Sequence, residues 1–284
     1  MLCILSQRDA ISASPHQPHM HLRLAFVLAI GVALFSAAAE NQDQSKVPAV
    51  AVTRNETVPI AIRDVEELVA KNVEAKGGAN ALRSLQSLKL TGKLIVNQGQ
   101  VQLGFVETKK RPGQVREDAT LQGMTAVQVC DGKEGWQISP FQGRKDPEKL
   151  SADDLKPLKE DAEIDGPLVD WKEKGSTIEY VGREDVDGTL AYKIKVVRKN
   201  GDVCFVYLDP DHFLEIRILT QRVQHGAQQE TETDVGDYEK IGGVFVPFSI
   251  EAGRKGDPDK QKIVFDKAEA NAPVDDTLFK FPTK

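Results

Sequence analysis

The sequence lacks the short motifs that mark most catalytic and nucleotide-binding classes. Its 284 residues contain no G-x-S-x-G elbow, no P-loop, no G-x-G-x-x-G loop and no C-x-x-C pair. These motifs signal hydrolase nucleophiles, phosphate sites and redox dithiols. Only two histidines, His212 and His225, follow residue 39, and no third ligand stands at metal spacing beside them. We therefore expect no enzymatic activity, no metal and no cofactor.

Basic charge is also in deficit. The chain has 37 lysines and arginines against 43 aspartates and glutamates, a formal net charge of −6. Binding to nucleic acid depends on a basic surface that neutralises phosphates. The charge balance therefore predicts that nucleic acid is not a partner.

Long apolar runs are absent, and the one short run stands near the N-terminus. Twelve apolar residues at 24–35 follow Met20 and Arg23, which is too few for the ~20 that span a bilayer. Small residues around Ala39 complete the three-part pattern of a secretory signal peptide at 1–39. Translation starting at Met20 fits this pattern, and an unusually long leader is the alternative. We expect an exported, periplasmic protein, soluble after cleavage, with a flexible linker at 40–61.

Cysteine is scarce. Of three cysteines, only Cys130 and Cys204 lie beyond the predicted signal peptide. Because an exported protein meets an oxidising compartment, these two can form one disulfide. Each lies in an apolar, strand-like run, so two buried free thiols are the alternative.

What the sequence has in abundance is the pattern of β-strands. Residues 203–222 predict a hairpin folded over Asp209-Pro210-Asp211, with β-branched and aromatic residues in both arms. About a dozen such runs follow one another through short turns, which is typical of one antiparallel sheet. We expect strands at 88–96, 101–109, 114–121, 125–130, 135–138, 177–182, 190–198, 203–208, 213–223, 228–239, 244–252 and 261–268.

A few helices accompany these strands. Apolar residues at helical spacing predict a helix over 62–76 that ends at Gly77-Gly78, with a further turn at 79–85. Ser151 has the form of an N-cap, and Pro157 is expected to keep its helix short. A second short helix is predicted from Pro167 to Gly175. A sheet of this length must curl, so the helices either cover an apolar cavity or complete a filled core.

Several segments resemble the outer-membrane lipoprotein-sorting proteins, relatives of the LolA and LolB carriers. The resemblance covers about residues 62–282. We expect one domain of this kind at 62–284. Its motifs are AKGG at 75–78, SLQSLKLTGK at 84–93, DGKEGW at 131–136, GREDVDG at 182–188, YLDPD at 207–211 and YEKIGGVFVP at 238–247. The resemblance implies a mainly β fold, an open and strongly curved antiparallel β-barrel with a few helices on its concave face. It also implies a cavity for lipoprotein acyl chains.

The functional arginine of the carriers and the anchoring cysteine of the acceptor lipoprotein find no match here. These absences count against the delivery of lipoproteins but leave the binding of an apolar ligand. We expect a binding or carrier protein for a lipid or the acyl chain of a lipoprotein, with inner- or outer-membrane envelope proteins as further partners. An envelope sensor that docks partners on the sheet and an enzyme that uses the cavity are the alternatives. No inward polar residues suggest themselves for catalysis. The expected cavity residues are Leu90, Leu94, Leu103, Phe105, Trp136, Ile138, Leu168, Trp171, Ile194, Val196, Leu214, Ile216, Ile218, Phe248, Ile250, Ile263 and Phe265.

Overall fold

One antiparallel sheet of 13 strands is the framework of residues 65–282, the part of the chain that the computed structural model describes. The predicted signal peptide at 1–39, the start at Met20 and the linker at 40–61 lie outside the described residues. The strands are β1 (Ser87–Val96), β2 (Val101–Lys110), β3 (Gln114–Leu121), β4 (Met124–Cys130), β5 (Gly135–Ser139), β6 (Arg144–Lys149), β7 (Thr177–Val186), β8 (Thr189–Val197), β9 (Val203–Leu208), β10 (Glu215–Gln224), β11 (Ala227–Ile241), β12 (Val244–Arg254) and β13 (Gln261–Ala270).

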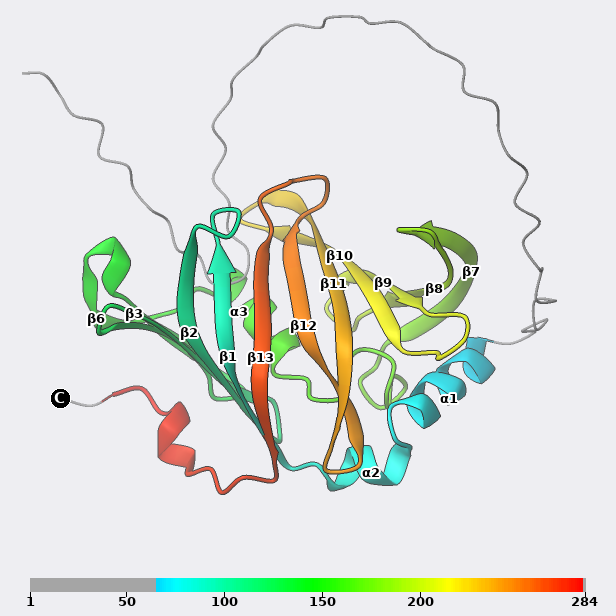
Figure 1. The fold of residues 1–284 in the computed structure, drawn as a ribbon, viewed down its shortest axis with the longest axis horizontal. Coiled ribbons are helices and arrows are strands. Elements are labelled where there is room, and N and C mark those ends of the chain that lie inside the picture. The colour runs from blue at the N-terminus through cyan, green and yellow to red at the C-terminus, as the bar shows by residue number, and fades with distance from the viewer. Residues whose placement is uncertain (1–64, 283–284) are drawn as a thin grey trace, which may run out of the picture.

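The chain builds this sheet in two arms that meet at its centre. The strand order is β6-β5-β4-β3-β2-β1-β13-β12-β11-β10-β9-β8-β7 (Figure 1). The first arm therefore runs outward from β1 to β6, and the second returns from β7 to β13. All neighbours pair through consecutive strands except β1 and β13, which join the two arms. Within the described residues β6 and β7 each pair on one side only, so the curved sheet is open.

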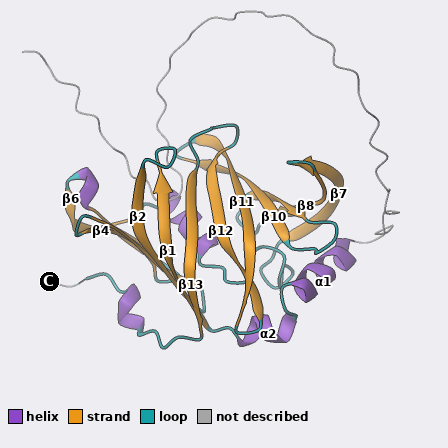
Figure 2. Cartoon of the chain, viewed as in Figure 1, coloured by secondary structure: helices purple, strands orange, loops and turns teal. Residues whose placement is uncertain are grey.

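Three α-helices pack on one face of this sheet (Figure 2). They are α1 (Val65–Ala75), α2 (Ala79–Ser84) and α3 (Ala152–Asp161). Leu68 of α1 packs on β8 and β9, Leu82 of α2 on β1, β2 and β12, and Leu158 of α3 on β3 and β4. The three helices thus divide the core of this concave face into neighbouring clusters.

The convex face carries its own cover at one end. The short 3-10 helix η2 (Asp276–Phe279) places Phe279 against Val127, Val129 and Trp136. Trp136 donates a hydrogen bond from Nε1 to the carbonyl oxygen of Phe279 at 3.2 Å. A second 3-10 helix, η1 (Pro140–Gln142), links β5 to the edge strand β6. The C-terminal segment therefore buries apolar side chains that face away from α3.

The predicted strands agree closely with the structure, down to the turn in the central hairpin. Asp209 Oδ1 accepts hydrogen bonds from the backbone N–H of Asp211 at 2.9 Å and of His212 at 2.7 Å. This is the side-chain turn chemistry that the sequence predicted. A bulge between Glu215 and Arg217 then interrupts the pairing of β10 with β9.

Two predictions of secondary structure are wrong. The helix expected from Pro167 to Gly175 is a series of turns, although its apolar residues Leu168 and Val169 are buried. The strand β6 was not predicted, because its residues RKDPEK have no apolar alternation. An edge strand needs no buried face, so this composition is compatible with pairing to β5.

Helix α3 begins as predicted but does not stop at its proline. Ser151 Oγ accepts a hydrogen bond from the backbone N–H of Asp154 at 3.1 Å, which is an N-cap. The helix continues through Pro157 to Asp161. Proline has no N–H to donate to the carbonyl one turn earlier, and here the Asp153 carbonyl oxygen accepts from Gln224 Nε2 of β10 at 3.2 Å. The proline thus frees an acceptor that ties the helix to the second arm.

The joint between the two arms requires a glycine. Gly92 of β1 lies at the bulge in the pairing with β13. A Cβ at this position would lie 2.6 Å from the Phe265 Cα and closer still to the Val264 carbonyl oxygen. Gly104 of β2, in the neighbouring strand, has only the Thr120 carbonyl oxygen nearby, at 3.9 Å.

We expect Gly92→Ala to lower the free energy of unfolding by about 2 kcal/mol, because backbone atoms must move to admit the methyl group. Gly104→Ala is the matched control and should change it by less than about 1 kcal/mol. Urea unfolding followed by tryptophan fluorescence measures both. Equal stability of the two variants would contradict the close approach at this joint.

Candidate functional site

A cavity of about 220 Å³ lies between the concave face of the sheet and the segment formed by α3 and residues 162–167. Strands β1, β2, β10, β11 and β12 contribute its floor, and α3 with the following turn contributes its opposite wall. In Figure 1, α3 lies behind the central strands of the sheet. The cavity is therefore bounded by both arms and by the helix that connects them.

Part of the wall is apolar. Strands β1 and β12 contribute Leu88, Leu90, Val244, Val246 and Ile250, and alternate side chains of each strand point the same way. All of these except Ile250 are at least nine-tenths buried. The two strands belong to opposite arms and are separated in the sheet only by β13.

The rest of the wall is polar and unusually rich in charge. Nine ionisable acidic and basic side chains line the cavity: Glu107, Glu160, Asp161, Glu163, Glu215, Lys76, Lys109, Arg198 and Arg222. This corrects the expectation that no inward positions carry polar residues. Several of these charged residues stand alone among the apolar residues of a strand. The sequence therefore does not show that their side chains point into one cavity.

One charged group ties the helices to the second arm. Lys76, just after α1, donates from Nζ to Glu215 Oε1 and to the Asp165 carbonyl oxygen, both at 2.9 Å. Tyr238 donates to the Glu215 carbonyl oxygen at 2.9 Å, and burial followed by the Glu215 carboxylate raises the pKa of Tyr238 well above its usual value. Since the side chains of Lys76 and Glu215 are only 11% and 5% exposed, they form a buried ion pair.

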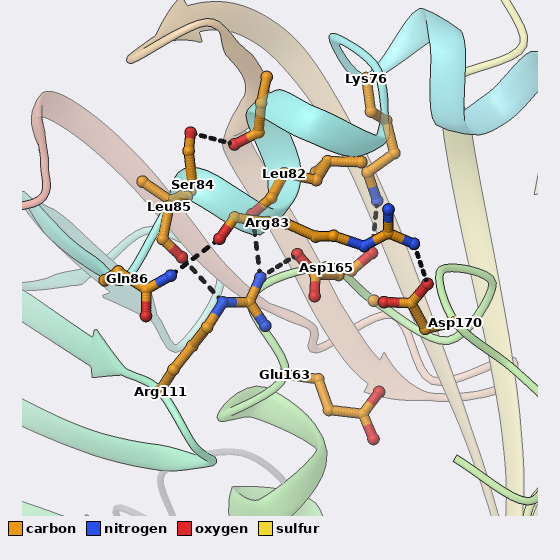
Figure 3. A network of polar contacts seen from close by, with 12 residues as sticks. Lys76, Leu82, Arg83, Ser84, Leu85, Gln86, Arg111, Glu163, Asp165 and Asp170 are labelled. Carbon is orange, nitrogen blue, oxygen red and sulfur yellow. Dashed lines mark hydrogen bonds and ion pairs between the residues drawn. The ribbon is translucent and has the colours of Figure 1, made fainter. Parts of the chain in front are cut away.

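Arg111, just after β2, extends this network to the first arm (Figure 3). Its Nε donates to the Leu85 carbonyl oxygen at 2.8 Å and its Nη2 to the Leu82 carbonyl oxygen at 3.1 Å. The same guanidinium forms an ion pair with Asp165. The carbonyl groups at the end of α2 are thereby satisfied by a side chain of the sheet.

Two arginines of the second arm pair with two glutamates near the end of α3. Arg222 Nη2 lies 3.1 Å from Glu160 Oε2, and Arg198 Nη1 lies 2.7 Å from Glu163 Oε1. Burial raises the pKa of Glu160, and the two guanidinium groups only partly offset this. The pairs hold α3 over β8 and β10.

A second charged group on β2 and β3 contains more carboxylates than cations. Glu107 and Glu117 are direct cross-strand partners and are 6% and 2% exposed, an arrangement that like charges disfavour. Lys109 contacts Glu107 at 3.2 Å. Burial raises the pKa of Asp161 to about 7, with Lys109 opposing, and burial together with Asp161 and Glu107 raises the pKa of Glu117 well above its usual value. At neutral pH this group therefore holds protons that isolated carboxylates would lose.

The structure places the predicted cavity residues in five environments. Leu90, Ile218 and Ile250 line the cavity. Leu94, Leu103, Phe105, Phe248, Ile263 and Phe265 belong to the filled core beside it, and Leu168, Trp171, Ile194 and Val196 pack with α1. Trp136 and Ile138 pack with Phe279, and Ile216 packs with Tyr207 and Leu219 on the convex face. Leu214 is half-buried just before β10.

The bulge in β10 explains why Ile216 and Ile218 separate. Strict alternation would place both side chains on one face, but the pairing with β9 shifts between Glu215 and Arg217. Ile218 therefore faces the cavity while Ile216 faces away from it. Nothing in the apolar pattern of residues 213–223 signals this shift. The role of the lining residues in binding stays a prediction.

The two described cysteines are free and buried. Cys130 of β4 packs with α3, and Cys204 of β9 packs with α1. Burial raises the pKa of both thiols, to about 11 for Cys204. Of the two alternatives that the sequence leaves open, the structure contains the two buried free thiols and not the disulfide.

His212 and His225, the histidines considered as ligands, lie beside aspartates at the surface. His212 Nδ1 is 3.0 Å from Asp209 Oδ1, and His225 Nε2 is 2.9 Å from Asp154 Oδ1. Within residues 65–282, no group of three or more His, Cys, Asp or Glu side chains is arranged to hold a metal ion. No helix in this range combines the length and the apolar character needed to cross a bilayer.

Comparison with known proteins shows similarity at the level of the fold. Neither a protein-family model nor a curated protein sequence matches the chain. A domain of an outer membrane lipoprotein-sorting protein from Vibrio parahaemolyticus has a TM-score of 0.52 at 11% identity, covering 75% of this chain and 94% of that one. A LolA superfamily protein from Nitrosomonas europaea has a TM-score of 0.52 at 10% identity, covering 75% and 96%. The predicted open, strongly curved LolA-like sheet is confirmed.

The raised pKa of Asp161 predicts a pH-dependent stability. A carboxyl group whose pKa is about 7 in the folded chain and ~4 in the unfolded chain binds more protons when folded between these values. Stability should therefore fall as the pH rises from about 4 to about 7. Asp161→Asn should remove part of this fall and be more stable than the parent by roughly 2 kcal/mol at pH 8, with little difference at pH 4.

Urea unfolding at several pH values measures this effect, with Asp146→Asn on the exposed strand β6 as the control. If the free energies of unfolding of Asp161→Asn and of the parent change with pH in the same way, the raised pKa of Asp161 is contradicted.

Proposed function

We propose, on the premise that the chain has the fold of LolA superfamily proteins, that it is an exported binding protein for a lipid or an acyl chain. The ligand occupies the cavity between the sheet and α3 and leaves it chemically unchanged. The predicted signal peptide supports a periplasmic location. A relative of the same fold is named as a lipoprotein-sorting protein, which supports an acylated ligand.

The observation that carries this proposal is the apolar wall of the cavity. Strands β1 and β12 provide this wall through Leu88, Leu90, Val244 and Val246. The cavity that they line has a volume of about 220 Å³. Burying hydrocarbon contributes ~0.8 kcal/mol for each CH₂ group. A chain of several methylene groups in this space would therefore bind with useful affinity without any covalent step.

An enzyme that uses the same cavity is a second candidate. The observation in its favour is Asp161, whose pKa of about 7 suits a general acid or base. Lys109, on the same cavity wall, is held by Glu107, and its pKa is raised overall although burial lowers it. Incubation with acyl esters and amides followed by mass analysis distinguishes the two: a binding protein returns every compound unchanged, and an enzyme releases products.

Replacement of one lining residue tests the binding function. We expect Ile218→Glu to weaken uptake of a fluorescent medium-chain fatty acyl probe about tenfold or more, because a carboxylate would occupy the cavity in place of an apolar group. Val223→Glu is the matched control on the same strand, since Val223 is 57% exposed and does not line the cavity. Fluorescence titration of the folded variants gives both affinities.

Circular dichroism and unfolding curves establish that each variant is folded. If Ile218→Glu binds the probe as tightly as Val223→Glu, the cavity is not the binding site.

A further inference from the structure

The polar wall of the cavity contains an ion pair with unused hydrogen-bonding groups on both partners. Arg222 of β10 and Glu160 of α3 share one hydrogen bond, from Nη2 to Oε2 at 3.1 Å. Nε and Nη1 of Arg222 and Oε1 of Glu160 are buried without a hydrogen-bond partner. Arg222 is only 7% exposed. Buried donors and acceptors normally have partners because leaving them unpaired carries a full desolvation penalty.

This ion pair therefore has two N–H donor groups on Arg222 and one carboxylate oxygen on Glu160 that form no hydrogen bond. Both residues line the cavity, so a ligand there lies within reach after a small side-chain rotation of the kind that often accompanies binding. A complementary ligand group must accept from Arg222 and donate to Glu160. An amide does both with its C=O and N–H, whereas an ester or an ionised carboxylate can only accept.

The charge around the cavity disfavours an anionic group. Five acidic and four basic side chains line it. Opposite charges are already paired, as in Arg198 with Glu163 and Lys76 with Glu215. A ligand carboxylate on the unused donors of Arg222 would lie beside the Glu160 carboxylate and be repelled by it, whereas an amide would not.

The apolar and polar walls belong to one cavity, so an amphiphilic ligand can use both. Leu88 and Leu90 of β1 with Val244 and Val246 of β12 provide the apolar wall, and Arg222 and Glu160 provide the polar wall. We propose that the cavity selects an acyl chain whose polar end is an uncharged amide, with Arg222 and Glu160 as the specificity-determining pair. This inference rests on the proposed function, because it requires an acyl chain in the cavity.

Three probes with one chain and different polar ends test this selection: decanamide, methyl decanoate and decanoate. Each displaces a neutral apolar fluorophore, 1-anilinonaphthalene, from the purified chain at pH 8. We expect decanamide to displace it at about tenfold lower concentration than decanoate, with methyl decanoate between them, as one or two hydrogen bonds to a charged group would give. Arg222→Gln should reduce the advantage of decanamide to about twofold or less.

Arg217→Gln is the matched control. Arg217 lies on the same strand, pairs with Asp187 at 2.9 Å and does not line the cavity, so the order of the three probes should persist. Arg222→Lys, which keeps the charge but loses the planar fork, guards against a folding defect and should also narrow the advantage of decanamide. Comparing probes on the same variant makes the readout independent of the fraction that is folded.

Two results would overturn the inference while leaving the proposed function intact: decanoate displacing the fluorophore as well as decanamide does, or Arg222→Gln keeping the parent's advantage of decanamide undiminished. Failure of the parent chain to take up the fluorophore and all three probes would overturn the proposed function itself, and the inference with it.

Discussion

The pairing of β1 with β13 is the contact on which the rest of the structure depends. Residues that pair between these two strands, such as Leu94 and Ile263, are more than 160 positions apart in the sequence. Without this pairing, each arm would be a separate sheet with a second unpaired edge, at β1 or at β13. Gly92 permits the close approach at the bulge, and the cavity lies where the two arms meet.

The connection between the arms has a second consequence. Because α3 lies between β6 and β7 in the sequence, it must cross from the first arm to the second. It packs on β3 and β4 through Leu155 and Leu158 and reaches β10 through Glu160 and the Asp153 carbonyl. The cavity and its charged wall therefore both lie at this crossing, between α3 and the strands of the two arms.

The sequence predicted local structure well because turn residues and alternating apolar residues act locally. Asp209 and Ser151 use their own side chains to fix a turn and a helix start, and both were predicted. Features that depend on tertiary contacts were not. The η2 cover over Trp136 and the convergence of Glu107, Asp161 and Arg222 join segments distant in sequence. The bulge that turns Ile216 away from the cavity is local, but the apolar pattern carries no sign of it. The polar wall could have been predicted only from single charged residues within apolar strands, such as Glu107 and Arg222.

The central claim is that the cavity holds an acyl ligand. Native mass spectrometry of the chain, purified without detergent from the cells that produce it, tests this most directly. We expect an added mass that dissociates on activation and is identified as an acyl compound after organic extraction. A chain that carries no added mass, and gains none when it is mixed with acyl amides, esters and acids of medium length, would contradict the proposed function.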